Sequence, residues 1–197
     1  MNNKSEISYY PEIMSFIEAQ IISNFKASYG KELQVFCKTG ELSSGLRNII
    51  NENHLKIKDI DDFATSVPPL NLDIFAIITD GNKFEILILE IKKTKSVGLN
   101  QWSQLVGYCI VSNARFGLLI NIDAGASLRL IDLLQNDINI STIQRIKAQG
   151  NNSVHILGMM EWNSMTKNIE YSNLGSVPSI SKLCNLIWER FNEDFQS

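Results

Sequence analysis

The sequence has few of the residues that build common metal, redox and disulfide sites. Its three cysteines, Cys37, Cys109 and Cys184, are far apart and form no CxxC pair, which argues against a disulfide framework and against a four-cysteine zinc or iron–sulfur site. The two histidines, His54 and His155, have no HExxH or HxxxH spacing, and nothing indicates a Ser-His triad. We therefore expect buried, free thiols in a cytoplasmic protein.

Other signals are also missing. The chain contains neither GxGxxG nor GxxxxGK[ST], so it has no signature of a nucleotide-binding loop. The first residues, MNNKSEISYYPEI, lack the apolar run of a signal peptide, and no segment is long and apolar enough to span a membrane. The formal net charge of −3 offers no general attraction to a polyanion, so any nucleic-acid contact must come from a local basic patch or from bound cations.

The residues that are present fit one α/β domain with a central mixed β-sheet flanked by helices. The chain has 197 residues, of which 44% are apolar and 20% charged, as is ordinary for a globular protein. Helical periodicity predicts helices over residues 11–25, 46–53, 100–112 and 180–195, with Ser43 or Ser44 capping the second and Ser179 near the start of the last. Strands are predicted over residues 33–37, 70–79, 84–93 and 116–122, with an outer hairpin at 154–162 and 168–172. We take residues 11–122 as the core and 124–197 as a C-terminal extension of the same domain.

The central hairpin is the most informative segment. Residues 70–79 (LNLDIFAIIT) and 84–93 (FEILILEIKK) are joined by Asp-Gly-Asn-Lys, a strong turn signal. The register that this turn favours puts Asp73 opposite Glu90, and a register shifted by two residues keeps both on one face. Lys92 is two residues after Glu90 and therefore shares that face. The pattern predicts that Asp73, Glu90 and Lys92 cluster at one end of the sheet.

Two neighbouring, part-buried carboxylates are costly, because they repel each other and lose hydration. A divalent cation resolves both problems, and Mg²⁺ prefers one or two carboxylates together with waters and phosphate oxygens. We predict Asp73 and Glu90 as metal ligands, with the backbone carbonyl of Ile91 as a further ligand. Lys92 would lie near the attacking water or the scissile phosphate. The alternative is that all three are ordinary charged residues where a strand leaves the core.

The spacing of these residues resembles the signature of a known superfamily. Asp73, followed after 16 residues by Glu90-Ile91-Lys92, is similar to the PD-(D/E)xK motif of many type II restriction endonucleases, RecB-like exonucleases and archaeal Holliday-junction resolvases. In the RecB-like branch the next helix carries Gln-x-x-x-Tyr near the substrate backbone, and Gln104 and Tyr108 stand at the matching place. The resemblance covers residues 69–122. It implies a restriction-endonuclease-like core and Mg²⁺ as cofactor, with Mn²⁺ as a possible substitute.

The resemblance also implies an acidic residue on the first helix that is directed at the metal. Glu18 is the best match because it interrupts an otherwise apolar stripe, and Glu12 is the second choice; the alternative for Glu18 is a salt-bridged helix residue. The sequence departs from the family in two respects. Leu72, not proline, precedes the first acid, and the four cysteines of iron–sulfur RecB-like enzymes are missing. The second departure excludes the cluster-containing subgroup but not the fold.

These observations predict a Mg²⁺-dependent deoxyribonuclease, an endonuclease in restriction-modification, phage defence or DNA repair. Its catalytic residues would be Asp73, Glu90, Lys92, Gln104 and Tyr108. Cutting both strands with one site per chain would favour a homodimer. The alternatives are a non-catalytic nucleic-acid-binding or assembly subunit with the same fold, an RNase of the same superfamily, and a structural α/β protein. Specificity would come from residues 40–66 and 124–175.

Overall fold

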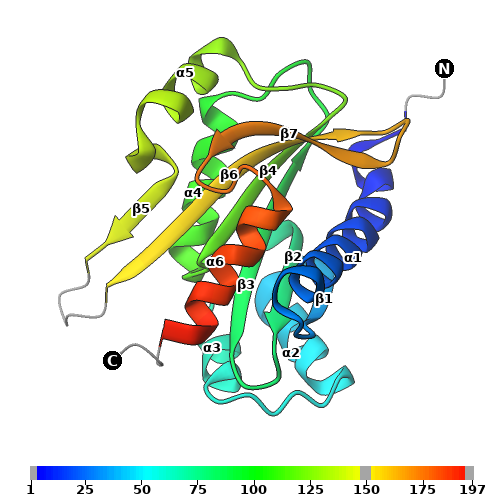
Figure 1. Cartoon of the computed structure of the whole chain (residues 1–197), viewed down its shortest axis with the longest axis vertical. Helices are drawn as coiled ribbons and strands as arrows, with labels where there is room; N and C mark the ends of the chain where they lie inside the picture. The colour runs from blue at the N-terminus through cyan, green and yellow to red at the C-terminus, as the bar shows by residue number, and fades with distance from the viewer. Residues whose placement is uncertain (1–3, 147–151, 194–197) are drawn as a thin grey trace.

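The computed structural model describes residues 4–146 and 152–193. Within these residues, seven strands form one mixed sheet between two layers of helices (Figure 1). The strand order is β1-β2-β3-β4-β6-β5, and β7 also pairs with β6. The strands are β1 (Gln34–Glu41), β2 (Asn71–Thr79), β3 (Phe84–Lys92), β4 (Phe116–Ile122), β5 (Thr142–Arg145), β6 (Ser153–Asn163) and β7 (Asn168–Gly175). The predicted α/β class with a mixed central sheet is confirmed.

Helices cover both faces of the sheet (Figure 1). On one face, Ile17 of α1 and Ile187 of α6 pack with Leu89 of β3, and on the other face Leu105 of α4 packs with Ile88. Burial on both faces explains why the central strands are almost continuously apolar. The helices are η1 (Glu6–Tyr9), α1 (Tyr10–Tyr29), α2 (Leu42–Glu52), α3 (Ile60–Ser66), α4 (Leu99–Ser112), α5 (Leu128–Asn136), η2 (Ile138–Ile140) and α6 (Ile180–Asn192).

The central hairpin has the predicted register. Strands β2 and β3 are antiparallel, with Ile74 opposite Leu89 and Thr79 opposite Phe84. The chain then crosses through α4 to β4, which runs parallel to β3, and β6 runs parallel to β4. The carboxyl ends of β3, β4 and β6 therefore lie at one edge of the sheet, and Glu90 and Lys92 are located at that end of β3.

The starts of two helices show how side chains cap the backbone. Helix α2 begins at Leu42, ahead of the predicted start, and the predicted caps Ser43 and Ser44 are wrong. The cap is Glu41, whose Oε1 accepts a hydrogen bond from the N–H of Ser43 at 2.8 Å. Helix α6 is capped by Ser179 as predicted, because its Oγ accepts from the N–H of Lys182 at 3.1 Å. The last residues of that predicted helix, 194–195, lie outside the described residues.

The strands of the predicted C-terminal extension are part of the central sheet. The expected outer hairpin exists as β6 and β7, but β6 also pairs with β4 and so extends the sheet inward. Sequence patterning predicts neither α3 nor β5, because elements of seven and four residues are too short to show a period. Helix α5 is also without a prediction.

The cysteines and the helices agree with two further expectations from the sequence. The three thiols are free, with Cys109 and Cys184 buried and Cys37 half-buried. No described helix has the length and apolar character needed to cross a membrane.

Gly158 in β6 allows the segment after β7 to pack closely against the sheet. A β-carbon at this position would lie 2.0 Å from the carbonyl oxygen of Val177. We expect Gly158→Ala to lower the free energy of unfolding by about 2–3 kcal/mol in a urea titration. Gly107→Ala in α4 is the matched control, because nothing lies within 4 Å of the added carbon. It should be neutral or stabilise by about 0.5–1 kcal/mol. Equal stability of the two variants would contradict this packing.

Candidate active site

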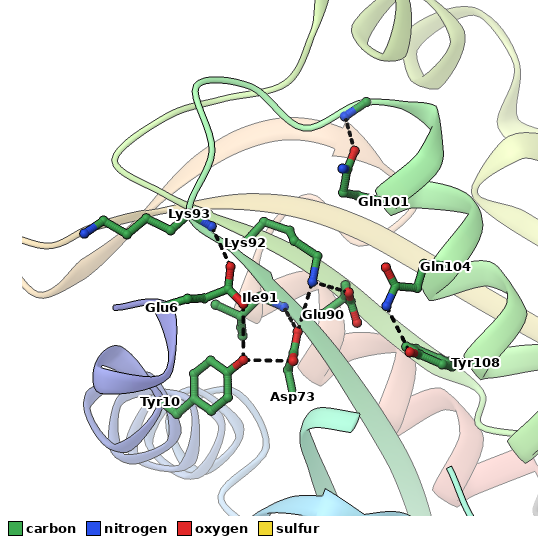
Figure 2. Close-up of polar contacts among 11 residues, drawn as sticks. Glu6, Tyr10, Asp73, Glu90, Ile91, Lys92, Lys93, Gln101, Gln104 and Tyr108 are labelled. Carbon is green, nitrogen blue, oxygen red and sulfur yellow. Dashed lines mark hydrogen bonds and ion pairs between the residues drawn. The ribbon is translucent and has the colours of Figure 1, made fainter. Parts of the chain in front are cut away.

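Asp73 lies at the centre of the polar contacts where β2 and β3 separate (Figure 2). Its Oδ2 accepts a hydrogen bond from the backbone N–H of Ile91 at 2.9 Å, and its Oδ1 accepts one from the Tyr10 hydroxyl at 2.8 Å. Backbone pairing between β2 and β3 ends at Ile74 and Leu89. The prediction that Asp73 pairs directly with Glu90 in the ladder is therefore wrong. The Asp73 carboxylate instead satisfies the N–H of Ile91.

Lys92 joins the two acids. Its Nζ lies 3.4 Å from Oδ2 of Asp73 and forms an ion pair with Oε1 of Glu90. Glu90 and Lys92 share a face of β3, as their spacing of two residues predicted. The structure therefore brings together the three side chains that the sequence singled out.

Glu90 is the most buried member of the cluster, with 1% of its side chain exposed. Its Oε1 forms an ion pair with Nζ of Lys92. Burial raises the pKa of Glu90 to about 7, since the charged form loses hydration; Lys92 opposes the shift and Asp73 adds to it. A buried carboxylate beside a second acid fits a bound cation, because the cation would offset the negative charge of both.

The neighbouring carboxylates keep Lys92 protonated. Burial by itself would lower the pKa of Lys92, but Glu90, Asp73 and Glu6 together outweigh it and hold the pKa above its ordinary value. Burial and the hydrogen bond to Asp73 also raise the pKa of Tyr10 above its ordinary value. Tyr10 is therefore a hydrogen-bond donor to Asp73, and Lys92 is a cation.

Sequence patterning misses Tyr10 and Glu6 as site residues. Tyr10 belongs to the apolar stripe of α1 by periodicity, and its partner Asp73 is distant in the sequence. Glu6 lies one turn earlier, where Oε2 accepts from the backbone N–H of Lys93 at 2.9 Å and Oε1 lies 3.4 Å from the Tyr10 hydroxyl. The available signal is weak: a hydroxyl at one end of an apolar stripe, preceded by an acid.

Glu18, the acid predicted to face the metal, is not part of this cluster. Its Oε1 accepts from the backbone N–H of Cys37 at 2.8 Å and so ties α1 to the edge strand β1. The second choice, Glu12, pairs with Lys167 at 3.1 Å. The reason is the placement of α1: its first residue, Tyr10, contacts Asp73, and Glu18 lies about two turns further along the helix.

Helix α4 carries Gln104 and Tyr108 on the side of the cluster opposite Tyr10 (Figure 2). Nε2 of Gln104 donates to the hydroxyl of Tyr108 at 2.9 Å, which confirms that the two share a helix face. In the part of the chain that the structure describes, no hydrogen bond joins this pair to the three charged residues. Gln101, one turn earlier, caps α4, since its Oε1 accepts from the N–H of Gly98 at 3.0 Å.

The donor set suits a divalent cation that is bound by two carboxylates. Among the described residues, no group of three or more His, Cys, Asp and Glu side chains is placed to hold a metal ion. Asp73 and Glu90, with the Ile91 carbonyl as a further candidate, instead match Mg²⁺, which usually keeps several waters and binds phosphate oxygens of the substrate. They do not match a closed zinc site, which uses four protein ligands.

Comparisons of the chain with protein-family models, with curated proteins and with solved structures find no match. The interpretation of the site therefore depends on its own geometry and on the spacing of its residues.

Proposed function

We propose that the chain is a metal-dependent nuclease of the PD-(D/E)xK type that hydrolyses DNA. The carrying observation is the contact of one ammonium group with two acids: Nζ of Lys92 forms an ion pair with Oε1 of the buried Glu90 and lies 3.4 Å from Oδ2 of Asp73. A buried ion pair contributes little net stability, because desolvation offsets the attraction. A catalytic role accounts for two acids gathered on one lysine better than stability does.

The roles of the residues follow from their charge and position. Asp73 and Glu90 would hold Mg²⁺, or Mn²⁺ in its place, with the carbonyl of Ile91 as a further ligand. When bound, the cation would supply an activated water and neutralise charge on the phosphate. Lys92, a cation held between the two acids, would bind the scissile phosphate and stabilise the negative charge that develops there. Gln104 and Tyr108 would contact the substrate backbone from α4.

The biological setting is part of the same proposal. The resemblance to the PD-(D/E)xK superfamily favours DNA over RNA, and an endonuclease in restriction-modification, phage defence or DNA repair in the cytoplasm. One site per chain would cut one strand at a time, so a homodimer would allow both strands to be cut. Light scattering of the active protein tests this point, since a monomer that makes double-strand breaks would exclude a dimeric requirement.

Cleavage of supercoiled plasmid and of linear duplex DNA tests the proposal. With Mg²⁺ or Mn²⁺ we expect cutting that EDTA and Asp73→Ala each abolish, because EDTA removes the cation and the substitution removes one of its ligands. Nicked and linear plasmid would identify an endonuclease, and loss of linear DNA alone an exonuclease. A matched RNA substrate separates the RNase alternative. If the wild type binds DNA but cuts no substrate, the non-catalytic subunit becomes the better interpretation.

A further inference from the structure

Tyr10 has no role in the proposed chemistry, yet it makes the shortest hydrogen bond to Asp73. The hydroxyl lies 2.8 Å from Oδ1, whereas the Ile91 N–H lies 2.9 Å from Oδ2. The two donors come from α1 and β3 and bind different oxygens of one carboxylate. Rotation of the carboxylate about its side-chain bond would break at least one of these hydrogen bonds, so the two donors together set its plane.

The tyrosine ring is itself held rigidly. Tyr10 is 7% exposed and belongs to the core cluster that α1 forms with the sheet. On its outer side, Glu6 lies within 3.4 Å of the hydroxyl and accepts from the backbone N–H of Lys93, the residue that follows Lys92. Nζ of Lys93 in turn donates to the carbonyl of Lys4 at 2.6 Å. The N-terminal segment is thereby fastened to the end of β3 (Figure 2).

Asp73 keeps some acceptor capacity beyond its hydrogen bonds to the protein. A carboxylate has about four lone-pair positions. Tyr10 uses one on Oδ1 and Ile91 uses one on Oδ2, while Nζ of Lys92 lies 3.4 Å from Oδ2 and pairs with Glu90 on its other side. The hydrogen bond from Tyr10 therefore helps to fix the carboxylate plane, and with it the positions of Asp73 that a cation could occupy.

We propose that Tyr10 is a positioning residue for the cation site: its hydroxyl orients the Asp73 carboxylate. The inference rests on the proposed function, because it needs Asp73 to be a metal ligand. Groups that orient a ligand from behind affect metal affinity by roughly 10–100-fold when they are removed. Among the described residues, the hydroxyl of Tyr10 contacts Asp73 and Glu6, and of these two only Asp73 is a proposed metal ligand.

Tyr10→Phe tests the inference, because it removes the hydroxyl and keeps the ring. Mn²⁺ binding is measured by isothermal titration calorimetry on the whole chain, well below the unfolding midpoint. We expect the Kd for Mn²⁺ to rise roughly 10–100-fold. The Mn²⁺ concentration that gives half-maximal cleavage should rise by a similar factor, while the KM for DNA at saturating Mn²⁺ stays unchanged.

Tyr9→Phe is the matched control. Tyr9 is also 7% exposed, but its ring meets the ammonium groups of Lys4 and Lys93, at 5.7 Å and 5.1 Å, and it does not contact Asp73. This variant should bind Mn²⁺ like the wild type. An unchanged Kd in Tyr10→Phe, or an equal loss in both variants, would overturn the positioning role.

The binding measurement also separates this inference from the proposed function. If the wild type binds Mn²⁺ and Tyr10→Phe binds it more weakly, the positioning role is supported even where no substrate is cut, and only the nuclease proposal fails. If the wild type binds no Mn²⁺, the metal site is absent and the role of Tyr10 is overturned with it.

Discussion

Lys92→Ala is expected to lower the rate of DNA cleavage by roughly 100- to 1000-fold at saturating Mg²⁺, the loss typical when one group that stabilises transition-state charge is removed. The Lys92 side chain is 18% exposed and is held between Asp73 and Glu90, so its ammonium group has a fixed position and a fixed charge. Alanine removes this charge from the site. Single-turnover cleavage of an end-labelled duplex measures the chemical step separately from DNA binding.

Lys26→Ala is the control for the loss of a positive charge. Lys26 pairs with Glu32 on the surface, where the two side chains are 62% and 79% exposed, and such pairs contribute little. This variant should cut at the wild-type rate.

The affinity of Lys92→Ala for Mn²⁺ should not fall, because the substitution removes a cation that competes for the same carboxylates. Cleavage at the wild-type rate by Lys92→Ala would show that the lysine is only a counter-ion.

Glu90→Gln is expected to stabilise the metal-free protein at pH 8 and to abolish metal-dependent cleavage. The pKa of Glu90 rises from an ordinary 4.5 to about 7 in the fold, so folding favours the protonated acid. Its contribution to stability is fully present below about pH 4.5 and is lost as the pH rises through about 7. That shift corresponds to roughly 3 kcal/mol. Since glutamine also loses part of the attraction to Lys92, we expect a net gain of roughly 1–3 kcal/mol at pH 8.

Urea unfolding in EDTA at pH 5 and pH 8 measures this effect. The advantage of Glu90→Gln over the wild type should be large at pH 8 and small at pH 5, where the wild-type acid is protonated in the fold. Glu52→Gln is the control, because Glu52 is 64% exposed and should show no such pH dependence. Mg²⁺ at pH 8 should stabilise the wild type but not Glu90→Gln, since a ligand stabilises only the state that binds it. A difference that is the same at both pH values would contradict the burial argument.

The central hairpin and the three charged residues on it can be predicted from the amino-acid sequence. Asp-Gly-Asn-Lys is a local turn signal, and the register that it favours is the one found, with Thr79 opposite Phe84. Side chains two apart on a strand share a face whatever the rest of the fold does, so Glu90 and Lys92 were predictable as neighbours. These features depend on interactions between residues that are close in the chain, and such interactions can be read from a pattern.

The residues that surround these three side chains depend on how distant parts of the chain pack together. Helical periodicity identifies the residues of α1 that face inward, but it does not say which point of the sheet each one meets. That depends on how α1 packs with α6 and β1, and the outcome places Tyr10 at Asp73 and Glu18 at the backbone of Cys37.

The same reason applies to β6. No local turn motif predicts the parallel pairing of β6 with β4, because the two strands are joined by a long connection that contains α5 and β5. Sequence patterning therefore predicts that β6 exists but not which strand it pairs with. The three charged residues of the site can be predicted from their spacing in the sequence. The contacts that support them come from long-range packing, which no short sequence pattern predicts.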